Sequence, residues 1–206
     1  YVTGMAVVKA CEALRKRLLE FAAAQLDLPV NTLLFSGNSI ASATDSKSCI
    51  SLKDLAFRAM CGGNTPLEAT AANSSPTSPP PFMAGMAEVE VDPETGHVEL
   101  IDYVGVVDCG TPINPAIARV QTEGGLLQGI GMTLTEQVRR TGDGRLVNNS
   151  FMQYKMPSRN DFPNIRVEFE SSYEPSGPFG AKSIGEIVIN TPAPAIAEAI
   201  YNATGL

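Results

Sequence analysis

The stretch Glu174-Pro-Ser-Gly-Pro-Phe-Gly-Ala-Lys-Ser-Ile-Gly-Glu186 organises the C-terminal half of this chain. Its prolines and glycines predict a backbone of tight bends, because proline fixes φ and glycine accepts conformations that other residues avoid. The stretch delivers one carboxylate, Glu186, in front of an apolar run at 187–200. A carboxylate held by a rigid loop at the edge of a packed segment can act as a general base. Glu186 as an acidic residue that only stabilises a helix start is the alternative that this pattern leaves open.

The composition excludes several classes of function. The 206 residues are 44% hydrophobic, which is enough to bury a core, and the net charge of −7 argues against a nucleic-acid partner. No apolar run approaches the length of a membrane span, and no leader with a charged and then an apolar segment is present. We therefore expect no membrane association.

The cysteines and the single histidine offer little for metal binding or nucleophilic catalysis. The cysteines are too widely spaced for zinc or iron–sulfur ligation, so we expect no metal ligands and four reduced thiols in a cytoplasmic protein. These residues are Cys11, Cys49, Cys61 and Cys109. His97 is expected in a turn between strands, where a Ser/His/Asp or Cys/His arrangement is not favoured.

The N-terminal part predicts two helices around a hairpin. Apolar residues recur at spacings of three and four over residues 3–27, as in a helix. Residues 33–42 predict a hairpin around Gly37-Asn38. Ser51 and Asp54 form a capping box that opens a second helix through about residue 60.

Residues 66–81 cannot continue that helix, and the chain could be subdivided near them. The segment is rich in proline and serine and carries a single charge. It can be a flexible linker between domains or an extended segment that lies across the protein, and the sequence leaves both open.

The C-terminal part predicts strands with helices between and after them. We expect strands at 82–91 and 97–108, with a turn between them, and a helix at 116–132. From residue 133 on, the sequence predicts a hairpin (133–139 with 145–147), a loop (153–163), a strand (165–170) and a final helix (191–201). The predicted fold class is α+β, with mixed, mostly antiparallel strands and packed helices.

The helix predicted at 116–132 contains an unusual number of glycines. These are Gly124, Gly125, Gly129 and Gly131. Each costs about 0.5–1 kcal/mol relative to alanine in a helix. Either tight helix packing or the close approach of a ligand would explain them, and the pattern does not choose between the two. Gln121 and Gln128 are seven residues apart and lie on one face of this helix.

Three motifs in order resemble the molybdenum-binding subunit of the xanthine dehydrogenase and aldehyde oxidase family. They are Val107-Asp-Cys-Gly-Thr-Pro-Ile-Asn-Pro115, Gln121-Thr-Glu-Gly-Gly-Leu-Leu-Gln-Gly-Ile-Gly131 and Gly180-Ala-Lys-Ser-Ile-Gly-Glu186. The opening Tyr1-Val-Thr-Gly-Met also looks like the helix that follows the pterin-binding loop of that family. The resemblance identifies residues 1–206 with the C-terminal part of the molybdenum-cofactor-binding domain. We expect residue 1 to be a cut inside a longer polypeptide.

The resemblance implies a hydroxylation of a heteroaromatic, purine-like ring or of an aldehyde, with oxygen taken from water. Glu186 would take a proton from a molybdenum-bound hydroxyl while hydride passes to a sulfido ligand. Gln121 would hydrogen-bond the pterin, with Glu123, Gly124 and Gly125 in the same turn and Gln128 as a weaker candidate. An adjacent helix N-terminus would favour the charged carboxylate of Glu186.

The resemblance also implies the cofactors and partners. The cofactor is a molybdenum–pterin, either molybdopterin or its cytosine dinucleotide form, and pterin sulfurs hold the metal. [2Fe-2S] clusters and FAD would lie on other domains or subunits. The partners would be the remainder of the molybdenum subunit, the iron–sulfur and flavin parts, and a small-molecule substrate. The alternative is an interaction module of a larger oxidoreductase complex, without chemistry of its own.

Overall fold

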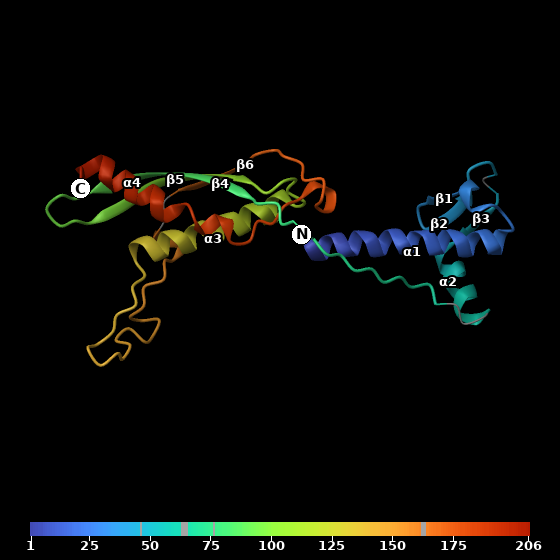
Figure 1. Cartoon of the computed structure of the whole chain (residues 1–206), viewed down its shortest axis with the longest axis horizontal. Coiled ribbons are helices and arrows are strands. Elements are labelled where there is room, and N and C mark those ends of the chain that lie inside the picture. Colours follow the sequence, from blue (N-terminus) through green and yellow to red (C-terminus); the bar gives the residue numbers. More distant parts are fainter. Residues whose placement is uncertain (46, 63–65, 76, 162–163) are drawn as a thin grey trace. The chain divides into compact units, whose positions relative to one another are not determined.

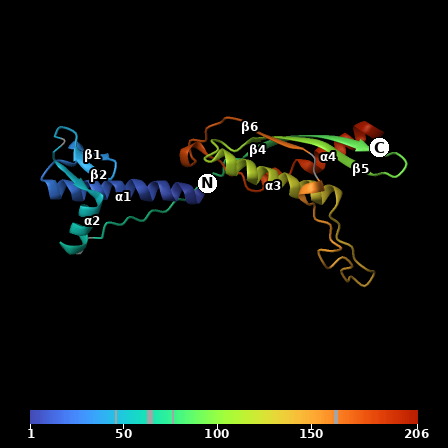
Figure 2. The ribbon, with the colours of Figure 1, turned by 180° about the vertical axis from the view of Figure 1, so that it is seen from behind.

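The chain divides into two compact units, Tyr1–Pro76 and Thr77–Leu206. The computed structural model describes residues 1–45, 47–62, 66–75, 77–161 and 164–206. Each unit has its own helices and its own sheet (Figures 1 and 2). Each also has its own buried hydrophobic residues. The division falls within 66–81, where the composition changes. Among the described residues, no helix is long and apolar enough to cross a membrane.

The first unit packs two helices around a small antiparallel sheet. The strands pair in the order β1-β2-β3, and the two helices flank them in the sequence. The elements are α1 (Val2–Leu26), a 3-10 turn (Val30–Thr32), β1 (Leu33–Ser36), β2 (Ser39–Ser42), β3 (Cys49–Ser51) and α2 (Leu52–Cys61). Both predicted helices and the hairpin are confirmed. The core of this unit contains Ala22, Leu33, Ile40, Ile50 and Leu55.

Local hydrogen bonds fix the ends of both helices. Asp27 ends α1 in the left-handed conformation, with φ of 54°. Ser51 caps α2, because its Oγ accepts a hydrogen bond from the Asp54 N–H at 3.0 Å and donates one to Asp54 Oδ2 at 2.7 Å. The N-cap half of the predicted capping box is therefore confirmed, and the Asp54 carboxylate bonds the Ser51 hydroxyl in place of the Ser51 backbone N–H.

The extended segment before the unit boundary lies along α1. Lys9 Nζ donates to Asn73 Oδ1 at 2.7 Å, and the Arg17 guanidinium donates to the Glu68 carbonyl. Ser75 Oγ donates to the Tyr1 hydroxyl at 3.4 Å. Of the two interpretations of 66–81, the extended one holds for this part of the segment.

The second unit is a three-stranded mixed sheet with two α-helices. The strand order is β4-β5-β6, in which β4 and β5 are antiparallel and β5 and β6 are parallel. The elements are β4 (Phe82–Val91), β5 (Val98–Asp108), α3 (Pro115–Leu134), a 3-10 turn (Arg159–Asp161), β6 (Ile165–Phe169), 3-10 turns (Pro178–Gly180 and Ile187–Ile189) and α4 (Pro192–Thr204). The predicted α+β class with mixed, mostly antiparallel strands is confirmed. Exposed His97 lies in the connection between β4 and β5, as expected.

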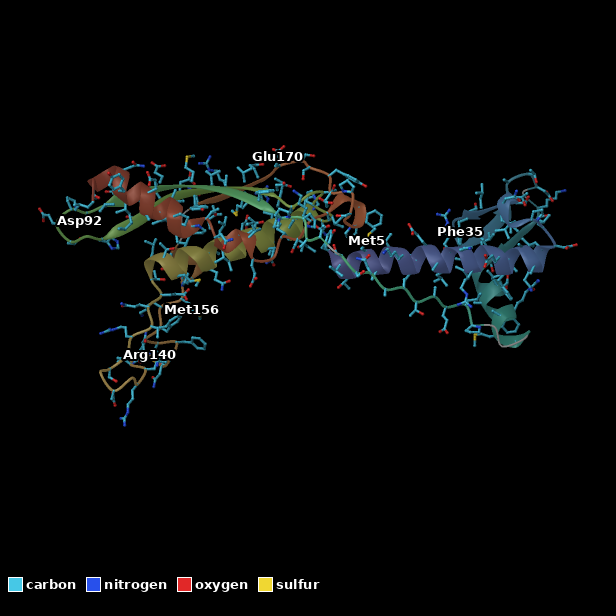
Figure 3. All side chains as sticks on the ribbon, in the orientation of Figure 1. Met5, Phe35, Asp92, Arg140, Met156 and Glu170 are labelled. Carbon is cyan, nitrogen blue, oxygen red and sulfur yellow. The ribbon has the colours of Figure 1, made fainter. Side chains whose placement is uncertain are left out.

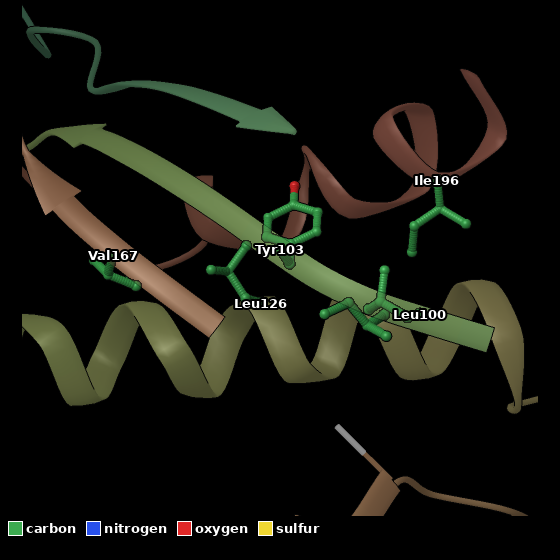
Figure 4. Packing of buried hydrophobic residues seen from close by; sticks show 6 residues of the cluster. Leu100, Tyr103, Leu126, Val167 and Ile196 are labelled. Atoms are coloured by element: carbon green, nitrogen blue, oxygen red, sulfur yellow. The ribbon is translucent and has the colours of Figure 1, made fainter. Parts of the chain in front are cut away.

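The core of the second unit lies between the sheet and both helices (Figure 4). It consists of Leu100 and Tyr103 of β5, Leu126 and Ile130 of α3, Val167 of β6 and Ile196 of α4. The buried Tyr103 hydroxyl donates to Thr191 Oγ1 at 2.9 Å. Since Thr191 directly precedes α4, this bond ties the start of that helix to the middle of the sheet.

Three of the four glycines of α3 allow close packing, and the fourth faces open space. A Cβ on Gly125 would lie 2.0 Å from Val188 Cγ2, and one on Gly129 would lie 2.7 Å from Pro192 Cγ. A Cβ on Gly131 would meet Pro157 at 2.6 Å, whereas one on Gly124 would meet nothing within 4 Å. Tight packing therefore explains three of the four glycines, and Gly124 remains available for the approach of a ligand.

The second predicted hairpin is present only as a short pairing around its turn. Residues 133–134 belong to α3, and one antiparallel bridge, Arg140 with Leu146, flanks the turn. The Thr141 N–H donates to the Arg145 carbonyl and the Val147 N–H donates to the Arg139 carbonyl, each within 2.9 Å. Figure 3 labels Arg140 and Met156 on this long connection. Val138 and Leu146 stay 59% and 41% exposed, so the segment has no buried face that could stabilise a longer strand pair.

The contrast between two neighbouring glycines gives a stability test. Gly125→Ala should destabilise the second unit by about 1–3 kcal/mol, because the new methyl group overlaps Val188. Gly124→Ala, in the same helix, should be neutral or stabilising by up to about 1 kcal/mol. Thermal unfolding of both variants measures the difference. Equal losses in the two variants would contradict the packing role of Gly125.

Candidate functional site

A groove of about 370 Å³ lies between one face of α3 and the segment that carries Glu186. It brings together five of the six predicted site residues. Its lining is Val120, Gln121, Gly124, Gly125, Gln128, Gly185, Glu186 and Ile189. Glu123 is the exception, because it lies on α3 between these positions and does not line the groove.

The start of α3 determines which of its residues lie on the face that lines the groove. Asn114 caps it by accepting a hydrogen bond from the Ile117 N–H at 3.1 Å, and Pro115 occupies the first turn. With this start, Gln121, Gly124 and Gln128 recur at spacings of three and four and share one face. Two amides with an open glycine between them therefore line one wall.

A side-chain hydrogen bond joins the two walls. Gln121 Nε2 donates to the carbonyl oxygen of Gly185 at 3.2 Å. Gly185 directly precedes Glu186, and a Cβ on Gly185 would meet nothing within 4 Å. The bond therefore places the backbone of the Glu186 loop against α3 and leaves open space beside it.

The helix next to Glu186 is shorter than the sequence suggested. Glu186 precedes the single 3-10 turn Ile187–Ile189 and makes no side-chain cap hydrogen bond, and α4 begins only at Pro192. The expected α-helix N-terminus is thus not adjacent to the carboxylate. The physical reason is packing, because fully buried Val188 turns into the space that Gly125 leaves. The Glu186 side chain itself is exposed.

Loop 174–186 is fastened to the end of β5 by backbone hydrogen bonds. The Lys182 N–H donates to the Cys109 carbonyl at 2.7 Å, and the Thr111 N–H donates to the Gly180 carbonyl at 2.8 Å. Gly110, with φ of 68°, lies between them, and a Cβ there would be 2.3 Å from the Gly180 carbonyl oxygen. This close approach requires glycine at position 110.

The carboxylate of Asp108 completes the attachment. Its Oδ2 accepts a hydrogen bond from Lys182 Nζ at 2.5 Å, and its Oδ1 accepts from Ser172 Oγ at 2.5 Å and from the Gly110 N–H at 3.0 Å. Burial would raise the pKa of Asp108, but the hydrogen bonds from Lys182, Ser172 and Gly110 outweigh it and lower the pKa from 3.8 to about 2.

Sequence reasoning missed the pairing of Asp108 with Lys182. Asp108 entered only as part of a motif before the helix. The available signal was a lone aspartate directly after an apolar strand run and a lone lysine inside a rigid loop. Charges in such places need partners, but 74 residues separate the two and sequence spacing does not show which charges meet.

The donor set of the groove suits an organic ligand better than a bare ion. Its lining offers side-chain amides, backbone groups and one carboxylate. Among the described residues, no group of three or more His, Cys, Asp or Glu residues could hold a metal. The four cysteines are free thiols, of which Cys109 is buried.

Residues 1–163 match the family described as "Molybdopterin cofactor-binding domain". The chain belongs to this family. It is 34% identical over 206 residues to the probable hypoxanthine oxidase XdhD of Escherichia coli (strain K12), covering 99% of this chain and 21% of that protein. It is 32% identical over 207 residues to the 6-hydroxypseudooxynicotine dehydrogenase complex subunit gamma of Paenarthrobacter nicotinovorans, covering 97% and 25%.

Solved structures agree with this membership of the molybdopterin cofactor-binding family. Quinoline 2-oxidoreductase from Pseudomonas putida 86 has a TM-score of 0.80 and 28% identity, covering 94% of this chain and 26% of that chain. The Cu,Mo-CO dehydrogenase shares the fold, with a TM-score of 0.80 at 23% identity and coverage of 98% and 26%. The chain spans about a fifth to a quarter of the length of the curated relatives named above.

The state of Asp108 predicts how stability depends on pH. Because folding lowers its pKa, its stabilising contribution is complete above the ordinary value of 3.8 and is lost as pH falls through about 2. The difference in unfolding free energy between the wild type and Asp108→Asn should be constant at pH 5–7 and shrink by about 2 kcal/mol toward pH 2.

Urea denaturation at several pH values measures this difference. Asp143→Asn is the control, because the ion pair of Asp143 with Arg145 is exposed and should contribute less than about 1 kcal/mol. A difference for Asp108→Asn that does not change between pH 6 and pH 2 would contradict the assignment.

Proposed function

We propose that this chain forms part of the active site of a molybdenum-cofactor hydroxylase. The substrate class is a heteroaromatic, purine-like ring or an aldehyde, and the oxygen comes from water. The observation that carries the proposal is that Glu186 and Gln121 share one groove and that Gln121 Nε2 bonds the residue before Glu186. The family membership supports the cofactor, and the named relatives support the type of reaction.

The groove fits a molybdenum–pterin, either molybdopterin or its cytosine dinucleotide form. Gly124 and Gly185 face space in which a Cβ would meet nothing within 4 Å, so a flat ring can approach both backbones. Gln121 uses its amino group on Gly185, so its carbonyl oxygen can accept a hydrogen bond from a ring N–H. Gln128 lines the same wall two turns further on. When bound, the cofactor supplies the oxygen transfer and the electron acceptance that side chains lack.

Glu186 is the proposed general base. Its carboxylate stands at the groove on a loop that is fastened on both sides, at 180–182 and at Val188. It would accept a proton from the attacking hydroxyl group. The hydrogen bond from Gln121 to Gly185 would hold the backbone next to Glu186 in a fixed position relative to the ligand. Glu123 lies outside the groove, and we assign it no part in cofactor binding.

The remaining partners follow the relatives. The relative from Paenarthrobacter is named as a subunit of a complex. We propose that the rest of a molybdenum subunit, together with [2Fe-2S] and FAD parts on other domains or subunits, completes the protein in the cytoplasm. The second candidate is a non-catalytic interaction module. The exposure of Glu186 favours it, but its position beside Gln121 favours the enzyme.

Glu186→Gln in the complete enzyme should retain the fold and the molybdenum cofactor. Its turnover should fall by about 10²–10⁴, because the amide cannot accept the proton. Metal analysis with single-turnover kinetics checks both parts. A variant that carries cofactor and turns over at the wild-type rate would exclude Glu186 as the base.

Gln121→Ala should weaken cofactor retention, since a lost ligand hydrogen bond is worth about 1–3 kcal/mol. Glu123→Gln is the matched control on the same helix and should retain the cofactor, because Glu123 does not line the groove. Pterin content after extensive dialysis measures both variants. Full pterin in Gln121→Ala, or equal loss in Glu123→Gln, would contradict the assignment.

A further inference from the structure

Two attachments flank the residues that lead to Glu186. On one side, the backbone of 180–182 bonds the segment 109–111. On the other, Val188 is fully buried against Gly125 of α3. Between them, the one side-chain bond from α3 is that of Gln121 to Gly185, among the bonds described for this part of the loop. The position of Glu186 therefore depends on how firmly both attachments hold.

The first attachment centres on Asp108. Ser172 bonds one oxygen of its carboxylate and Lys182 bonds the other, each at 2.5 Å. Ser172 precedes the loop 174–186, and Lys182 lies four residues before Glu186. A single carboxylate thus holds both the entry of the loop and the part that leads to the groove.

The environment of this ion pair makes it stronger than a surface pair. The side chains of Lys182 and Asp108 are 12% and 18% exposed. Lys182 Nζ also lies 5.4 Å from the centre of the Phe82 ring. Away from water, the attraction is less screened, and removing one partner leaves the other charge unpaired. Neither Lys182 nor Asp108 lines the groove, so neither would touch its ligand.

We propose that Asp108 and Lys182 are positioning residues whose ion pair holds loop 174–186 so that Glu186 faces the groove beside Gln121. This inference rests on the proposed role of Glu186. The pair acts through the backbone, because Lys182 N–H bonds Cys109 as its side chain bonds Asp108. Releasing the pair would leave residues 180–182 held only by their backbone bonds to 109–111, while Val188 stays anchored.

The test uses the complete native enzyme with Lys182→Met, which keeps the apolar stem and removes the charge. We expect kcat to fall by about 10²-fold with little change in KM, because a misplaced catalytic group lowers the rate more than binding. We also expect hydrogen exchange of the backbone amides of 182–189 to become about tenfold faster. Lys182→Arg keeps the charge and should restore most of the rate.

The control is Arg166→Met. Arg166 lies on β6 and pairs with Asp102 on β5, so this variant also leaves an aspartate without its cation, although Arg166 is 64% exposed and Lys182 only 12%. Its exchange at 182–189 should match the wild type, and its kcat should stay within about twofold. If both variants lose turnover to the same extent and both show equally faster exchange at 182–189, the pair supports only general stability and the proposal is overturned.

Two further outcomes overturn the proposal. One is unchanged exchange at 182–189 in Lys182→Met, and the other is faster exchange with an unchanged kcat. Glu186→Gln, measured in parallel, keeps the two proposals apart. If that variant turns over normally, the proposed function fails, and the exchange data still show whether the ion pair holds the loop.

Discussion

The carboxylate of Asp108 is the constraint on which the site geometry depends. It ends the central strand β5 and collects donors from Gly110, Ser172 and Lys182. The sheet core positions Asp108, because the neighbouring Val107 is fully buried. Asp108 thereby fixes loop 174–186, which has no strand of its own, to the end of the sheet. A loop rich in glycine and proline has few alternatives for such support, because it has few side chains to pack.

Helix α3 provides the second support for the Glu186 loop. Within one helical turn, one of its glycines packs against the loop and another stays open to the groove. Gly125 and Gly129 let Val188 and Pro192 approach the helix backbone, which holds the 3-10 turn after Glu186 and the start of α4 against α3. Gly124, one residue earlier, points into open space. A side chain at Gly125 would push the segment away, and one at Gly124 would reduce the groove. Packing is thus the correct interpretation for Gly125, Gly129 and Gly131, and the approach of a ligand at Gly124 stays a prediction.

Much of the fold was predictable, because periodicity and capping act locally. The strand pair at 82–108 follows from its turn, and α2 follows from Ser51 and Asp54. The site was predictable in part, because Gln121 and Gln128 share a face by helix geometry alone. The pairing of Asp108 with Lys182, the parallel register of β6 and the exclusion of Glu123 depend on tertiary contacts, which local patterns do not encode. The hairpin predicted at 133–147 shows the converse, because its turn forms a single bridge and the flanking residues do not extend it into strands without a face to bury.

The hydrogen bond from Gln121 to Gly185 connects the two supports in one chemical argument. The Gln121 amide has a donor and an acceptor end. Its amino group bonds the carbonyl before Glu186, and its oxygen can accept a hydrogen bond from a ligand in the groove that Gln121 lines. A ligand that donates to that carbonyl would polarise the amide and strengthen its bond to Gly185. Binding and the placement of the carboxylate are then coupled through one side chain. Gln121→Glu retains an acceptor but loses the amino group that bonds Gly185. The variant should therefore lower kcat, through a less fixed position of Glu186, more than it lowers cofactor retention. Comparing kcat with cofactor retention in that variant tests the coupling, and equal losses of both would argue against it.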